Sequence, residues 1–89
     1  MEEEKILVGK ISHYFSKIGV AVIELTDTLA VGDEISIEGR VTNLRQTVES
    51  MEIEHKKIDG AKPGDSIGMK VSDKVREKDN VYKIISATE

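Results

Sequence analysis

RQTVESMEIEH, residues 45–55, is the stretch whose conformation decides the fold, because its apolar residues fit two periodicities. Leu44, Val48 and Met51 recur at intervals of four and three residues, which is the spacing of one face of a helix. From Met51 onward, apolar and acidic residues alternate, which is the spacing of a half-buried strand. The stretch therefore predicts either an amphipathic helix or a strand.

The composition of this stretch favours the strand. A helix remains an alternative, with Asn43 as its N-cap. However, the stretch contains β-branched residues, which lose rotamer freedom in a helix. In a regular strand Val48 and Met51 would face opposite sides, so both reach the core only if one extra residue is inserted between them. We therefore expect a strand with a β-bulge near Glu49 or Ser50.

The rest of the chain continues this β pattern in both directions. Short apolar runs are separated by glycine, proline and polar clusters, and no helix is predicted with confidence. Together with the bulged strand this gives about six strands, and closure into a barrel would leave no exposed edge. The other strands are expected at residues 5–11, 20–25, 34–39, 66–71 and 81–85, with a loop over residues 12–19 and Leu29 and Val75 as buried anchors.

Length and composition limit the class of protein. The 89 residues predict one domain, 1–89, of which we expect residues 1–4 to be disordered. Its core must come from aliphatic side chains, because only 3% of the residues are aromatic. Abundant glutamate and lysine without cysteine is typical of heat-adapted (thermophile) proteins. The acidic start lacks the basic region of a signal peptide and no apolar run is long enough for a membrane, so we expect a soluble cytoplasmic protein.

The charge and the motifs argue against several kinds of chemistry. A net charge of −4 argues against bulk nucleic-acid binding but allows a local basic patch. The phosphate-binding loop of nucleotide-binding proteins is missing, and no nucleophile with an adjacent base is visible. His13 and His55 have no evident metal-ligating partners. The residues therefore predict no enzyme, no catalytic residue, no metal and no cofactor.

Two short motifs contain the candidate contact residues. HYFSK, residues 13–17, is the aromatic cluster of the chain, in which we expect Phe15 to serve the core and Tyr14 to be free to stack on a base with Lys17 on phosphate. Glu52 and Glu54 would lie on one side of the predicted strand, where solvated surface is the ordinary interpretation and a ligand contact the alternative.

The order of motifs resembles a known family. LAVGDEISIEG, TVESMEIEH, AKPGDSIGMKV and VREKDNVY follow one another as in the second domain of translation factors such as elongation factor Tu. HYFSKIGVAVIEL and QTVESMEIEH are more similar to small stand-alone translation-factor-like proteins and to the C-terminal β-barrel of collagenase-like peptidase-family proteins. The resemblance implies an all-β fold, a closed six-stranded antiparallel Greek-key barrel of the translation-factor domain 2 type.

The resemblance also implies a function and a site. Glu52 matches the glutamate that contacts the terminal adenosine of aminoacyl-tRNA in elongation factor Tu. Lys17 lies in the loop that carries a basic residue, an arginine, in that factor. We therefore expect a non-catalytic module that contacts RNA (tRNA or rRNA) through Glu52, Tyr14, Lys17 and Arg45. The alternative is an adaptor that docks on a ribosome-associated or RNA-modifying protein. The GTPase domain is not part of the resemblance, so we expect no GTP bound by this chain.

Overall fold

Strands make up all of the regular structure in the part of the chain that is described. The computed structural model describes residues 2–87, and their side chains over residues 4–85. The all-β prediction is therefore confirmed. The strands are β1 Glu2–Phe15, β2 Val20–Leu25, β3 Leu29–Ala30, β4 Glu34–Glu38, β5 Asn43–Thr47, β6 Met51–Ile53, β7 Lys56–Ile58, β8 Gly60–Ala61, β9 Ser66–Lys70 and β10 Asn80–Ala87.

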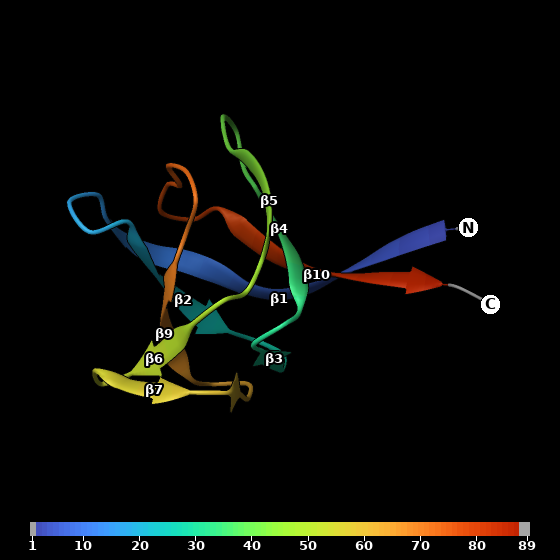
Figure 1. Ribbon diagram of the computed structural model, residues 1–89. Helices are drawn as coiled ribbons and strands as arrows, with labels where there is room; N and C mark the ends of the chain where they lie inside the picture. The colour runs from blue at the N-terminus through green and yellow to red at the C-terminus, as the bar shows by residue number, and fades with distance from the viewer. Residues whose placement is uncertain (1, 88–89) are drawn as a thin grey trace.

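Eight of these strands form one strongly curled antiparallel sheet. Its order is β5-β4-β10-β1-β2-β9-β6-β7, and β3 and β8 form a separate two-stranded ladder. Figure 1 shows β1 and β10 running side by side toward the two ends of the chain. Because the strand order ends at β5 and at β7, strand pairing alone does not close the sheet. The expected closed barrel of six strands is therefore not confirmed, whereas the antiparallel sheet is.

The core lies inside the curled sheet and follows the two-residue period of its strands. In β4, Ile35 and Ile37 are fully buried, and in β9 the same holds for Ile67 and Met69. Burial of such aliphatic side chains contributes about 1.5–3 kcal/mol each, which is the main stabilising force in a domain with few aromatic residues. Leu29 and Val75, the two anchors expected in connections, are also buried.

The stretch over residues 45–55 is extended, interrupted and then sharply turned. β5 ends at Thr47 and β6 begins at Met51, and the irregular residues between them leave both Val48 and Met51 only 1% exposed. No β-bulge forms near Glu49 or Ser50, because β5 pairs with β4 whereas β6 pairs with β9 and β7. The expected bulged strand is therefore divided into two strands with different neighbours. β6 stops at Ile53, so the expectation that Glu54 belongs to the strand is wrong.

Three local features differ from what the sequence pattern favours. β1 continues through Phe15, where we expected a loop, because His13, Tyr14 and Phe15 pair with β2. β1 also begins at Glu2, within the segment 1–4 that we expected to be disordered, and residue 1 lies outside the described residues. Ser36 stands between the inward-facing Ile35 and Ile37 but is itself 3% exposed, and its hydroxyl donates a hydrogen bond to Glu38 Oε2 at 2.7 Å.

Candidate functional site

An open apolar groove lies on the outer face of the sheet, over β2, β9 and β6. It encloses about 410 Å³. The turn after β1 and the turn after β6 form its rims, so segments far apart in the sequence meet there. The lining residues are Phe15, Ile18, Val20, Val22, Glu52, Glu54, His55, Ser66, Ile67 and Gly68.

The walls and floor of the groove follow from strand alternation. In β2, Ala21, Ile23 and Leu25 point into the core, so Val20 and Val22 face outward. Gly68 pairs with Val22 on one side and with Glu52 on the other. Because Gly68 has no side chain, the floor between these two strands is left open. A Cβ built at Gly68 would lie 3.5 Å from Val20 Cγ1, an ordinary contact.

Two large apolar side chains of the first turn stand at the rim. Phe15 is 47% exposed and Ile18 is 62% exposed. The His13 ring packs edge-on against Phe15 with ring centroids 4.4 Å apart, and His13 Nδ1 lies 3.2 Å from Glu77 Oε2. Phe15 was expected in the core, which is wrong, because it is the last residue of β1 and lies on the outer side of the sheet.

The opposite rim carries two carboxylates. Within residues 4–85, neither Glu52 nor Glu54 forms an ion pair, although Lys57 faces Glu52 across the β6–β7 ladder. No lysine or arginine lines the groove. Glu54 and His55 have φ values of 51° and 66°, so they form the two central positions of a type I′ turn between β6 and β7. This turn is what brings Glu54 and His55 to the groove.

The predicted contact residues are only partly brought together. Tyr14 is half-buried and packs against the core, and it borders a small hollow next to the groove together with Phe15, Lys17 and Ile18. Arg45 lies on β5, where its Nε is 3.1 Å from Glu34 Oε2. Glu52 thus lines the same groove as Phe15 and Ile18 from the end of β1 and the turn after it. Arg45 lies on β5, which does not contribute to the groove.

The sequence reasoning missed most of the apolar lining. Val20 and Val22 were not among the predicted contact residues, and the structure leaves them half-buried. The signal was present in VAVIEL, which is nearly all apolar. β2 lies inside the sheet order, between β1 and β9, but only one face of a single sheet covers the core, so its other apolar residues face outward. Gly68 carried no signal in the sequence, since its importance comes from its two partners across the sheet.

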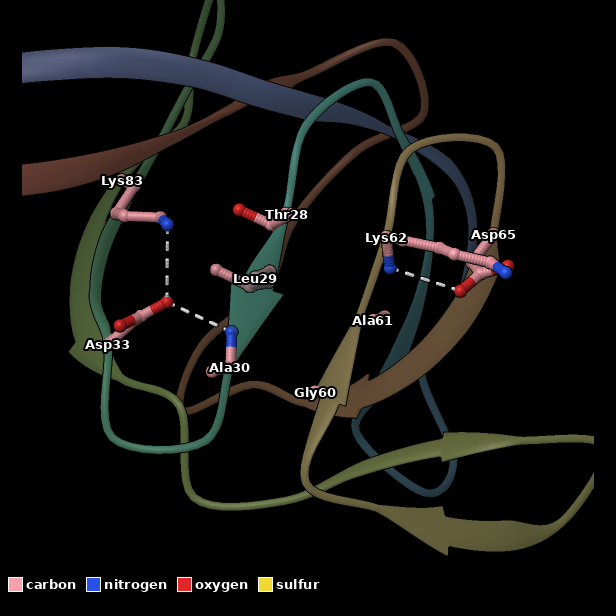
Figure 2. A pocket seen from close by; sticks show the side chains of 9 residues that line it. All are labelled: Thr28, Leu29, Ala30, Asp33, Gly60, Ala61, Lys62, Asp65 and Lys83. Atoms are coloured by element: carbon pink, nitrogen blue, oxygen red, sulfur yellow. Dashed lines mark hydrogen bonds and ion pairs between the residues drawn. The ribbon is translucent and has the colours of Figure 1, made fainter.

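A second hollow has a polar lining and lies between the β3–β8 ladder and β10 (Figure 2). Asp33 Oδ2 accepts a hydrogen bond from the Ala30 N–H at 2.9 Å and lies 3.6 Å from Lys83 Nζ. Asp65 Oδ2 accepts one from the Lys62 N–H at 3.1 Å. Both acids are therefore engaged in holding turns and strands together, which is a structural role.

The described residues form neither a candidate metal cluster nor a membrane-spanning helix. Over residues 4–85, no three histidine, cysteine, aspartate or glutamate side chains gather in a cluster able to hold a metal ion. The same part of the chain has no helix with the length and apolar character needed to cross a membrane.

The described residues form a small antiparallel β domain with an open apolar groove on the outer face of its sheet. No family model matches the chain. The chain is 42% identical over 79 residues to an uncharacterized protease of Methanocaldococcus jannaschii, covering 88% of this chain and 19% of that protein. It is 40% identical over 82 residues to a collagenase of Porphyromonas gingivalis, covering 90% of this chain and 20% of that protein. The chain thus spans about a fifth of the length of these relatives.

A solved structure has the same fold. The C-terminal domain of a putative U32 peptidase of Geobacillus thermoleovorans superimposes with a TM-score of 0.82 at 22% identity, covering 88% of this chain and 91% of that domain. These matches support the expected resemblance to the C-terminal β domain of collagenase-like peptidase-family proteins. They do not show the resemblance to the second domain of elongation factor Tu.

The comparisons overturn the expected function. The relatives are named protease and collagenase, which contradicts the expectation of a translation-factor module that contacts RNA. The expectation of a protein outside enzyme families is wrong for the same reason. The sequence motifs misled because short glycine-acid turns between strands record the fold, and one fold serves many functions.

Proposed function

We propose that this chain contributes to a peptidase-family function by binding a polypeptide segment in the groove over β2, β9 and β6. The observation that supports this most is the groove itself, an apolar hollow of about 410 Å³ with two carboxylates on its rim. Hollows of about 300–1,000 Å³ lined mainly by apolar side chains, with a few polar groups, are typical of binding sites.

The names of the relatives supply the class of ligand. Proteases, collagenases and peptidases all act on polypeptides, and these are the names of the curated relatives and of the solved structure. An exposed apolar surface with two unpaired acids suits a peptide, which offers both apolar side chains and charges. Holding such a segment is the part of a peptidase function that the geometry of this chain supports.

The proposal is tested by adding denatured collagen peptides and casein peptides to the ¹⁵N-labelled chain and recording the backbone amide signals. We expect the largest shifts at Ile18, Val20, Val22 and Gly68. Ile18→Ser should weaken binding, because the side chain is 62% exposed at the rim. Val41→Ser is the matched control, since Val41 is 66% exposed away from the groove. An unchanged spectrum with both mixtures would refute the proposal.

We also propose that β5, β4, β10, β1, β2 and β9 close as the six-stranded Greek-key barrel expected from the sequence. The support is a side-chain link from β5 to the end of β9. Gln46 Nε2 donates to Lys70 O at 3.0 Å, and Gln46 Oε1 accepts from the Ser72 N–H at 2.8 Å. Hydrogen exchange would test this, because closure predicts slow exchange at Ser72, and fast exchange there would contradict it.

A further inference from the structure

We infer that the groove selects polypeptide segments in which a large apolar side chain lies next to a lysine or arginine. This inference rests on the proposed function and adds the chemistry of the ligand. It depends on three observations: the open floor at Gly68, the two rim carboxylates, and the pairing of the backbone beneath the groove.

The floor at Gly68 accommodates the apolar side chain. On either side of it stand Val22 from β2 and Glu52 from β6, and the backbone between them carries no Cβ. Val20 and Ile18 extend the apolar wall toward the first turn. A ligand side chain that enters here is removed from water, which contributes about 25 cal/mol per Å² of apolar surface that it buries.

The rim at Glu52 and Glu54 accommodates the lysine or arginine side chain of the ligand. Neither acid forms an ion pair within residues 4–85, and the lining contains no lysine or arginine. Lys57, opposite Glu52 in the ladder, and Lys17, next to Ile18 in the first turn, lie outside the lining. A lysine or arginine of the ligand that reaches over the apolar side chain would meet both carboxylates.

The backbone beneath the groove explains why side chains must give the selectivity. β9 pairs with β2 over Ser66–Lys70 and with β6 at Gly68 and Met69, so the backbone at the floor of the groove is already engaged on both sides. A ligand strand therefore cannot be added at Gly68 by main-chain hydrogen bonds, as happens at exposed sheet edges. Recognition depends instead on the apolar walls and the two acids.

Short synthetic peptides with blocked ends test the inference. The probe has a central Phe-Lys pair in a Gly-Ser background, and two further peptides carry Phe-Glu or Gly-Lys in its place. The ¹⁵N-labelled full chain is titrated with each peptide at low and high salt. We expect the Phe-Lys peptide to bind about two- to fivefold more tightly than Phe-Glu, with the difference reduced by salt, as for exposed ion pairs.

Variants of the chain identify the groups responsible. The pair of changes Glu52→Gln and Glu54→Gln should abolish the preference for Phe-Lys over a Phe-Gln peptide, while Glu49→Gln, an exposed acid outside the lining, should leave it intact. Gly68→Val should weaken all Phe peptides because it fills the floor. If its amide spectrum shows that this variant does not fold, Ile18→Ser replaces it in the same comparison.

The outcomes separate the two proposals. Tight binding of Phe-Lys that depends on the two acids supports the inference. Equal binding of Phe-Lys and Phe-Glu at the groove overturns the inference but leaves polypeptide binding in place. Binding of neither Phe peptide, together with an unchanged spectrum in the collagen and casein titrations, overturns both.

Discussion

The side chain of Gln46 accepts a hydrogen bond from the backbone N–H of Ser72 at 2.8 Å. The Nε2 of the same Gln46 side chain donates a hydrogen bond to Lys70 O at 3.0 Å. One side chain of β5 thus satisfies two backbone groups where β9 ends. β5 is one end of the strand order, and its Gln46 side chain reaches backbone groups at the end of β9. Gln46 therefore joins two strands that share no backbone ladder.

Loss of the Gln46 side-chain amide should destabilise the fold. We expect Gln46→Ala to lower the free energy of unfolding by about 1–2 kcal/mol, because two hydrogen bonds of about 0.5–1.5 kcal/mol each are lost at a half-exposed site. Gln46→Glu should cost a similar amount, since a carboxylate cannot donate to Lys70 O. Urea unfolding followed by circular dichroism measures the change, with Asn43→Ala on the same strand as the control. Equal midpoints for Gln46→Ala and Asn43→Ala would contradict the assignment.

Two glycines of the sheet should respond in opposite ways to alanine. A Cβ at Gly9 would lie 2.6 Å from Glu24 O and 2.9 Å from Ile23 Cγ2, so β1 and β2 would have to separate. We expect Gly9→Ala to cost about 1–3 kcal/mol, as overpacking does. Gly68→Ala should be neutral or slightly stabilising, because its Cβ meets nothing closer than 3.5 Å. Comparable losses in denaturant unfolding for both variants would show that close approach at Gly9 is not the constraint.

The stability of the protein should fall in acid partly through Glu38. Hydrogen bonds from Lys5 and then from Ser36 hold the pKa of the Glu38 carboxyl below its ordinary value. Because the folded state binds this proton less readily, the stabilisation is present above the unfolded pKa of about 4.3 and is lost as pH falls through the lowered folded pKa. The side chains of Lys5 and Glu38 are 45% and 34% exposed, so solvent screening limits the effect to at most about 1 kcal/mol.

Thermal unfolding between neutral and acidic pH measures this contribution. Glu38→Gln should remove part of the pH dependence, whereas Glu49→Gln, an exposed acid with no described partner, should keep it. A parallel decline of Glu38→Gln and the unmodified chain would rule out the assigned role of Glu38.

The turn between β6 and β7 should be stabilised by glycine. His55 has a φ of 66°, which is a left-handed conformation. Relief of about 1–2 kcal/mol of strain outweighs the roughly 0.4–1 kcal/mol that a more flexible unfolded chain costs, so His55→Gly should gain about 0.5–1 kcal/mol. Lys56→Gly, one residue on and within β7, should lose stability instead. A loss for His55→Gly in urea unfolding would show that its side chain contributes more than its backbone costs.

The predictability of each element depended on how local its cause is. The inward positions of Ile35, Ile37, Ile67 and Met69 follow from the sequence, because alternation along one strand fixes which face they share. The interruption between Val48 and Met51 was predictable for the same reason, since both had to face inward. Phe15 was misplaced because its exposure depends on where β1 ends against β2, which is a contact between strands.

The candidate site was predictable only in fragments. Glu52 and the segment at Tyr14 and Lys17 were singled out from the sequence, and the groove does join Glu52 to that segment through Phe15 and Ile18. Arg45 was grouped with them but lies on β5, beside Glu34. The translation-factor function from which their expected roles were taken is contradicted by the names of the relatives. Turn motifs shared by one fold carry no information about its ligand.

Local spacing was enough to predict that the chain is all-β, which residues of the regularly alternating strands face the core, and that Val48 and Met51 both point inward, because each depends on a few neighbouring residues. The tertiary structure alone decided that Gly68 lies between Val22 and Glu52 and that the turn at Glu54 and His55 faces Phe15 and Ile18. Such neighbours are set by strand order and register. These depend on how the whole sheet curls around its core, and no local pattern of residues specifies them.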